Sequence, residues 1–210
     1  EKQNITKSKP KRHVTLTLEQ LALLEDKMIE NGETQLLHFV NFLYLTGIRP
    51  VEAKRLQIKH LNGFRSALNL PSEITKNGQP RSIRVGEYFK NLLNEMGIQN
   101  FPPNFFVFSN NGTIGEIPTG RNYFSRKFKE IRLKCDDLTP FYTLYSYRHT
   151  FALNFMMEPL ENENNEDKRF ELMGVLGHSK FETTEIYLKG FPKELVSKSK
   201  WQGMKHWRQK

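Results

Sequence analysis

Five residues that together can attack a phosphodiester occur in a fixed order along this chain. Arg49 lies in TGIRPVEAKRL, Lys76 in ITKNGQPRSIRV and Arg148 in LYSYRHTFA. His178 follows in LGHS, and Tyr187 lies nine residues beyond it. A tyrosine hydroxyl can act as a covalent nucleophile when cationic and hydrogen-bonding groups gather around its target. The set therefore indicates phosphodiester cleavage by a tyrosine, without a metal ion.

Each of the helper residues has a chemical role and a plainer alternative. Arginine donates two hydrogen bonds to phosphate from one planar fork, so Arg49 and Arg148 are candidates to bind the oxygens on which charge builds. The alternative for each is a surface arginine, since the chain has 32 Lys and Arg residues. Taken alone, Lys76 is better interpreted as a solvated turn lysine, and His178 as a structural histidine.

The order and local context of these motifs resemble those of the tyrosine recombinases, the phage integrase family, over residues 18–195. TGIRPVEAKRL is similar to the first-arginine motif of the family, and RHTFA to the second. The most specific signal is the LGHS…TT…Tyr187 spacing. The resemblance implies that Tyr187 forms a 3′-phosphotyrosyl link and releases a 5′ hydroxyl, and that a second strand's hydroxyl then reverses the link. It implies no ATP, metal or other cofactor.

The same resemblance assigns roles to the other motif residues. TKNGQPRSIRV is similar to the lysine-bearing β-hairpin of the family, so Lys76 would protonate the leaving 5′ oxygen. His178 would bind a phosphate oxygen or position the nucleophile, and Glu52 would orient an arginine. The implied partners are double-stranded DNA and three further copies of the chain, as a homo-tetramer on two DNA sites.

One position departs from the family pattern. The family usually has histidine three residues before the second arginine, where this chain has Tyr145. A tyrosine hydroxyl can donate a hydrogen bond to phosphate, but with a pKa of about 10 it is a poor acid–base group near neutral pH. Tyr145 is therefore a candidate catalytic donor in place of that histidine.

The pattern of apolar and polar residues predicts a mainly helical α+β fold with one small antiparallel sheet. Thr17 and Gln20 form a capping-box signal, and the next helix should end at Gly47. The expected helices span residues 18–31, 33–46, 50–57, 87–96, 122–134, 146–157, 168–176 and 181–189. Residues 64–85 should form the sheet, with a tight Asn-Gly turn beside Lys76. Residues 101–120 are predicted as a loop with one short strand, and 161–167 as an acidic loop.

Composition is consistent with a DNA partner without establishing one. The net charge is +9, and such an excess attracts polyanions. The basic-aromatic run RNYFSRKFKEIRLK is the expected region of phosphate contact. A single cysteine, Cys135, excludes an internal disulfide framework. No apolar run is long enough to span a membrane. We expect a cytoplasmic, nucleoid-associated protein of bacterial or phage context.

Three segments and three functions follow from these patterns. Residues 1–16 are predicted to be a basic linker or arm, 17–190 a catalytic domain, and 191–210 a tail that packs on a neighbouring protomer or on its own domain. The leading function is a site-specific DNA recombinase or integrase. The alternatives are a type IB topoisomerase-like DNA relaxase and a non-catalytic DNA-binding regulator on the same fold, for which Tyr145 would be the first sign.

Overall fold

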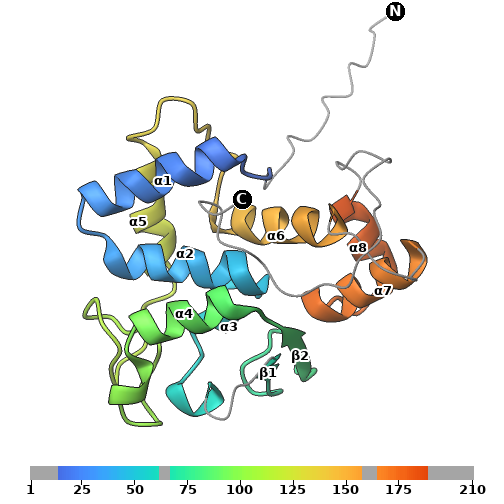
Figure 1. The fold of residues 1–210 in the computed structure, drawn as a ribbon, viewed down its shortest axis with the longest axis horizontal. Helices are drawn as coiled ribbons and strands as arrows, with labels where there is room; N and C mark the ends of the chain where they lie inside the picture. Colours follow the sequence, from blue (N-terminus) through green and yellow to red (C-terminus); the bar gives the residue numbers. More distant parts are fainter. Residues whose placement is uncertain (1–13, 62–66, 158–164, 189–210) are drawn as a thin grey trace, which may run out of the picture.

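The structure is a computed structural model that describes residues 14–61, 67–157 and 165–188 (Figure 1). Its α-helices are α1 (Leu18–Glu30), α2 (Thr34–Thr46), α3 (Pro50–Ala53), α4 (Glu87–Glu95), α5 (Tyr123–Arg132), α6 (Leu144–Met157), α7 (Asn165–Leu176) and α8 (Phe181–Leu188). Two short 3₁₀ helices are η1 (Ile58–His60) and η2 (Ile98–Asn100), and the strands are β1 (Ala67–Leu70) and β2 (Arg81–Arg84). The predicted class, mainly helical with a small antiparallel sheet, is confirmed.

Helix α2 forms the centre of the fold. It packs against α1, α3, α4, α5 and α6, and Figure 1 shows it running between α1 and α4. Phe39 and Phe42 project from α2 into a group of aromatic rings that includes Phe89, Phe108 and Phe124. Phe39 stacks on Phe124 with a centroid distance of 3.8 Å, and Phe42 meets Phe89 edge-on at 4.9 Å. Because α2 is packed on nearly every side, its C-terminal end has a fixed position.

Local signals set the ends of α1 and α2 as predicted. The Thr17 side chain accepts from the Gln20 backbone N–H, and the Gln20 side chain accepts from the Thr17 N–H, which completes the capping box. Gly47 ends α2 in the left-handed conformation, with φ of 65°. The positive φ is only one reason why position 47 is a glycine. A Cβ at this position would also lie 2.3 Å from the Phe151 ring.

The sheet differs from the expected tight hairpin. Strands β1 and β2 pair antiparallel, with Ala67 opposite Arg84 and Leu70 opposite Arg81. The connection between them runs from 71 to 80, so Asn77-Gly78 lies within a longer loop and does not join the strands directly. Gly78 still adopts a positive φ of 70°, which explains the turn signal. The chain therefore turns at the expected place, but within a loop of ten residues in which Ile74 and Thr75 are buried, instead of in a tight hairpin.

Three other expected boundaries also moved. Helix α3 ends at Ala53 instead of continuing to residue 57, and α7 begins at Asn165, within the segment expected to be an acidic loop. Between η2 and α5 the chain forms isolated bridges at Phe106 and Ser109 but no strand. The apolar residues of this segment were interpreted as one short strand. The sequence pattern alone could not distinguish a strand from isolated bridges.

Parts of the predicted organisation lie outside the described residues. These are most of the arm (1–16), the start of the acidic segment (161–164) and the tail (191–210). Within the described ranges, no helix has the length and apolar character needed to cross a bilayer. Cys135 is buried with a free thiol, as an ordinary core residue.

Candidate active site

Arg49 is placed by the junction between α2 and α3. Gly47 ends one helix, Pro50 occupies the first position of the next, and Arg49 is the N-cap residue between them. Its guanidinium donates to Glu52 Oε1 at 3.0 Å and to the Gly177 carbonyl at 2.8 Å. The described contacts of Arg49 leave other N–H groups of the guanidinium available to a ligand.

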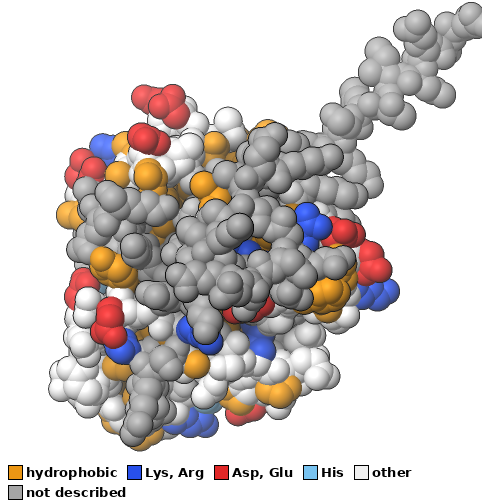
Figure 2. Space-filling model, turned by 45° about the vertical axis from the view of Figure 1, so that its right-hand side comes forward, with side chains coloured by type: hydrophobic (Ala, Val, Ile, Leu, Met, Phe, Trp, Pro, Cys, Tyr) orange, Lys and Arg blue, Asp and Glu red, His pale blue; other side chains and the backbone are white. Residues whose placement is uncertain are grey.

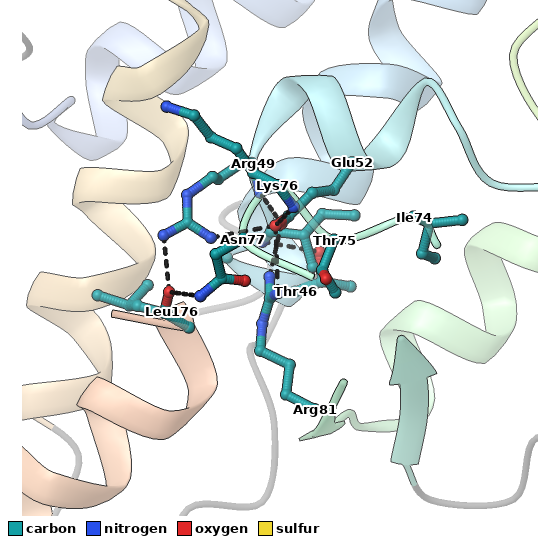
Figure 3. Close-up of polar contacts among 12 residues, drawn as sticks. Thr46, Arg49, Glu52, Ile74, Thr75, Lys76, Asn77, Arg81 and Leu176 are labelled. Carbon is teal, nitrogen blue, oxygen red and sulfur yellow. Dashed lines mark hydrogen bonds and ion pairs between the residues drawn. The ribbon is translucent and has the colours of Figure 1, made fainter. Parts of the chain in front are cut away.

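The carboxylate of Glu52 is the centre of a buried polar cluster (Figure 3). Its side chain is fully buried, and it accepts from the backbone N–H groups of Arg49 and Lys76 at 3.0 and 3.1 Å. Arg81 adds a bidentate ion pair, at 3.2 and 2.6 Å. Burial alone would raise the pKa of this carboxyl. The hydrogen bonds and charge of Arg81, with the two backbone donors, outweigh burial and lower the pKa from 4.5 to about 2.

Three arginines from distant parts of the chain meet the last carbonyls of α7 and the residue that follows. The pairs are Arg81 Nε with the Val175 oxygen at 3.0 Å, Arg148 Nη2 with the Leu176 oxygen at 2.7 Å, and Arg49 Nη2 with the Gly177 oxygen at 2.8 Å. The last carbonyls of a helix have no partner within the helix and carry the negative end of its dipole. This turn therefore collects positive groups, and it lies directly before α8.

Arg148 is a deeply buried arginine. It lies in α6 with 1% of its surface exposed, and its two terminal nitrogens donate to the carbonyls of Gly47 and Leu176. Arg148 thus joins the end of α2 to the end of α7. A cation so buried is held by backbone dipoles, which fixes its position for an anionic ligand.

His178 lies between Arg148 and α8. Its Nε2 is 3.3 Å from Arg148 Nη2, and its Nδ1 is 2.9 Å from Thr184 Oγ1. Burial, followed by the charges of Arg148, Arg49 and Arg81, lowers the pKa of His178 from 6.5 to about 3. His178 is therefore neutral at physiological pH in the ligand-free chain.

Lys76 approaches the cluster through its backbone. The N–H of Lys76 donates to Glu52, while its side chain is exposed, and Asn77 next to it donates to the Gly177 carbonyl at 3.4 Å. The β1–β2 connection is thus tied both to Glu52 and to the turn after α7 (Figure 3). The ammonium group remains accessible on a side chain whose base is fixed.

Tyr145 lies one helical turn before Arg148 on α6. Its side chain lines a pocket of about 280 Å³, together with Pro50 next to Arg49 and with Phe128 and Lys129 of α5. Tyr145 is thus on the side of the site that faces α5, whereas His178 is on the side of α7 and α8.

Tyr187 falls in α8, and its side chain lies outside the part of the chain that the structure describes. The backbone of α8 follows directly on the turn that receives the three arginines. Among the described residues, no group of three or more His, Cys, Asp or Glu side chains could hold a metal ion.

One residue of the site, Arg81, was not singled out from the sequence, although it lies in the quoted motif TKNGQPRSIRV. Thr184 belongs to the TT pair of the LGHS…TT…Tyr187 spacing, but it was assigned no role from the sequence and was not distinguished from Thr183. Arg81 reaches Glu52 across 29 residues, and a Cβ on Gly177 would lie 3.0 Å from its guanidinium. The one available signal was that Arg81 lies on the strand directly after the lysine-bearing loop.

The basic run on α5 is only partly exposed. Arg126 and Lys129 are exposed, whereas Lys127 is paired with Glu33 and Arg132 is buried against the carbonyls of Pro140 and Tyr142. On the face shown in Figure 2, Lys and Arg side chains lie in separate places among Asp and Glu. The candidate phosphate contacts of this run are therefore Arg126 and Lys129 on α5, with the exposed Arg121 before the helix and the exposed Lys134 after it.

A mainly helical domain in which two arginines and a histidine converge before a tyrosine-bearing helix has the architecture of a tyrosine recombinase catalytic domain. The chain belongs to the phage integrase family, whose model matches residues 14–194. No curated protein matches the sequence.

Solved structures with the same fold include several recombinases. XerA recombinase has 21% identity and a TM-score of 0.66, with 86% of this chain covered. XerH site-specific recombinase bound to its difH substrate has 17% identity and a TM-score of 0.62, with 90% covered. A lambda integrase dimer bound to a COC′ core site has 15% identity and a TM-score of 0.65, with 89% covered. This chain covers only 62%, 54% and 51% of those three proteins, respectively.

Proposed function

We propose that this chain is the catalytic domain of a site-specific DNA recombinase or integrase. Tyr187 attacks the scissile phosphate, a bond forms between its oxygen and phosphorus, and the bond to the 5′ oxygen breaks. Lys76 supplies the proton to that oxygen. The 5′ hydroxyl of a second strand then attacks the phosphotyrosine, which restores the tyrosine and joins the new strands.

One observation carries this proposal. Arg49 and Arg148 are held at adjacent carbonyls of the turn that precedes the helix of Tyr187, although they lie 128 and 28 residues away from their acceptors. Fixed donors aimed where charge develops lower a barrier most when they need no rearrangement. A phosphate that replaces a carbonyl as acceptor would find two guanidinium groups already in place. Family membership and the DNA-bound recombinases of the same fold support DNA as the substrate.

The proposed nucleophile is tested by the variant Tyr187→Phe, which removes only the hydroxyl. The substrate is a pool of duplexes of randomised sequence that carry a nick, so that a short cleaved fragment diffuses away and the covalent link persists. We expect the wild-type chain to give an adduct that survives denaturation, and Tyr187→Phe to give none while retaining DNA binding. Tyr142→Phe is the matched control, since this ring loses only a bond from Gln20.

The other outcomes separate the alternatives. An adduct that persists in Tyr187→Phe would place the nucleophile elsewhere. If the wild-type chain binds DNA without any adduct, the protein is a non-catalytic regulator. If it relaxes supercoiled plasmids that share no sequence, it is a topoisomerase-like relaxase.

The assembly follows from the same proposal. Strand exchange between two sites needs one nucleophile for each of four strands, so we propose a homo-tetramer on paired DNA sites, with residues 191–210 in contact with a neighbouring protomer. The protein would then act at the bacterial nucleoid or on phage DNA. The mass of the complex on trapped DNA, measured by sedimentation, tests the tetramer.

A further inference from the structure

A buried hydroxyl lies behind the histidine of the site. Thr184 is on α8, has no exposed surface, and places its Oγ1 2.9 Å from His178 Nδ1. Its neighbour Thr183 is exposed. Two adjacent threonines on one helix therefore differ in whether they reach the histidine.

The opposite edge of the imidazole faces a group that can only donate. Arg148 Nη2 lies 3.3 Å from His178 Nε2, and a guanidinium carries N–H groups but no acceptor. This contact is a hydrogen bond only when Nε2 carries its lone pair. In the neutral ring the proton is then on Nδ1, which donates to Thr184 Oγ1.

The two other states of the ring fit the two described contacts poorly. A proton on Nε2 would point at the N–H of Arg148 and leave Nδ1 without its proton. A doubly protonated ring would add a charge beside three guanidinium groups: Arg148 from α6, Arg49 from the α2–α3 junction and Arg81 from β2. Burial, followed by those charges, lowers the pKa of His178.

We propose that Thr184 is a positioning residue that accepts from the Nδ1–H of His178 and so fixes the ring, in the tautomer that Arg148 selects by donating to Nε2. In this state Nε2 cannot donate to a phosphate oxygen. Two roles were expected for His178: to bind a phosphate oxygen or to position the nucleophile. The arrangement in the ligand-free chain supports the second role. The tautomer of His178 does not depend on the proposed function. The expected effect on DNA cleavage does rest on the proposed function.

The tautomer can be measured directly. In a chain labelled with ¹⁵N at histidine, the two ring nitrogens of each residue give different shifts when one is protonated and the other is not. The chain has six histidines, and the spectrum of His178→Gln identifies the signals that belong to His178. We expect a protonated Nδ1 and an unprotonated Nε2 near neutral pH. A protonated Nε2 in the wild-type chain would overturn the proposal without any variant.

Matched substitutions then test the hydroxyl. Thr184→Val keeps the shape and removes the acceptor of the Nδ1–H, so the Nδ1–H signal should shift and exchange faster with water, while Arg148 keeps Nε2 unprotonated. Thr184→Ser should restore the wild-type signals, and Thr183→Val should leave them unchanged. An unchanged His178 spectrum in a folded Thr184→Val chain would refute the role of Thr184. Should Thr184→Val not fold, the same comparison is made with Thr184→Ala.

The effect of Thr184 on cleavage is measured with the same pool of nicked duplexes of randomised sequence. We expect Thr184→Val to form the adduct about tenfold more slowly, as for the loss of one hydrogen bond, with DNA binding unchanged and with rescue by Thr184→Ser. An altered Nδ1–H signal with wild-type cleavage would show that Thr184 positions the ring without consequence for the reaction. If no variant or wild-type chain forms an adduct, the proposed function fails while the tautomer result stands.

Discussion

Arg81 and Glu52 form a bidentate ion pair inside the domain, with the two N···O distances at 3.2 and 2.6 Å. The pair ties β2 to α3. Because Glu52 also accepts from Arg49 and from the Lys76 backbone, this one carboxylate connects the first arginine to the lysine-bearing loop. Two of the proposed catalytic side chains therefore depend on Arg81, which contacts neither of them in the described interactions.

The first prediction concerns the removal of Arg81. Arg81→Met leaves a buried carboxylate without its main partner, so the free energy of unfolding should fall by about 3–5 kcal/mol, measured by urea titration. The double variant Arg81→Met with Glu52→Gln should lose less, because the uncompensated charge is gone. A single variant as stable as the wild type would show that Arg81 does not stabilise the cluster.

The second prediction is a loss of stability in acid. The lowered pKa of Glu52, about 2 instead of 4.5, means that its contribution is fully present above pH 4.5 and is lost as the pH falls through 2. Between pH 5 and pH 3 the Glu52 contribution should fall by about 2 kcal/mol. Arg81→Met is the comparison, because its Glu52 pKa should lie nearer to 4.5. Equal pH dependence in both chains would contradict the assignment.

The third prediction concerns Gly47. Gly47→Ala combines a left-handed backbone with a Cβ 2.3 Å from the Phe151 ring, and should cost about 2–5 kcal/mol of unfolding free energy. Gly32→Ala is a matched control with a similar φ of 66° and open space around its Cβ, so it should cost only about 1–2 kcal/mol. Thermal unfolding of both variants measures the difference, and equal losses would show that the Phe151 contact is unimportant.

The fourth prediction tests Tyr145, where the chain departs from the family pattern. If its hydroxyl donates to a phosphate oxygen, Tyr145→Phe should slow adduct formation about ten- to a hundredfold, with DNA binding nearly unchanged. Tyr145→His keeps a hydrogen-bond donor and should retain part of the activity. Arg148→Lys loses the planar guanidinium and should form the adduct more slowly than either Tyr145 variant. Wild-type cleavage by Tyr145→Phe would limit Tyr145 to packing in the pocket beside Pro50.

The fifth prediction concerns non-specific DNA binding. Affinity should fall steeply with salt, with a slope of about −0.9 in log–log form for each phosphate neutralised. Arg126→Ala and Lys129→Ala should each reduce that slope by about 1, because both side chains are exposed on α5. Lys90→Ala on α4, where the ammonium is paired with Glu87, should leave it unchanged. Binding that does not vary with salt would exclude this mode.

The sequence by itself determined the elements whose causes are local. Thr17 and Gln20 start α1 through bonds that span three residues, and Gly47 ends α2 because a left-handed residue is needed there. The motifs around Arg49, Arg148 and His178 also indicated the chemistry, since residue type and spacing are properties of the chain. The chain turns at Asn77-Gly78 as expected, but the expected tight hairpin was wrong, because a turn signal does not give the length of the loop around it.

Only the tertiary structure decided which residues hold the site together. Arg81 meets Glu52 across 29 residues, and Arg49 meets Gly177 across 128, so no window of sequence contains both partners. Burial is decided in the same way: Thr184 is enclosed and Thr183 is exposed, although the two are chemically identical neighbours. Which of two equal side chains becomes a partner depends on how α8 packs, and that packing is a property of the whole fold.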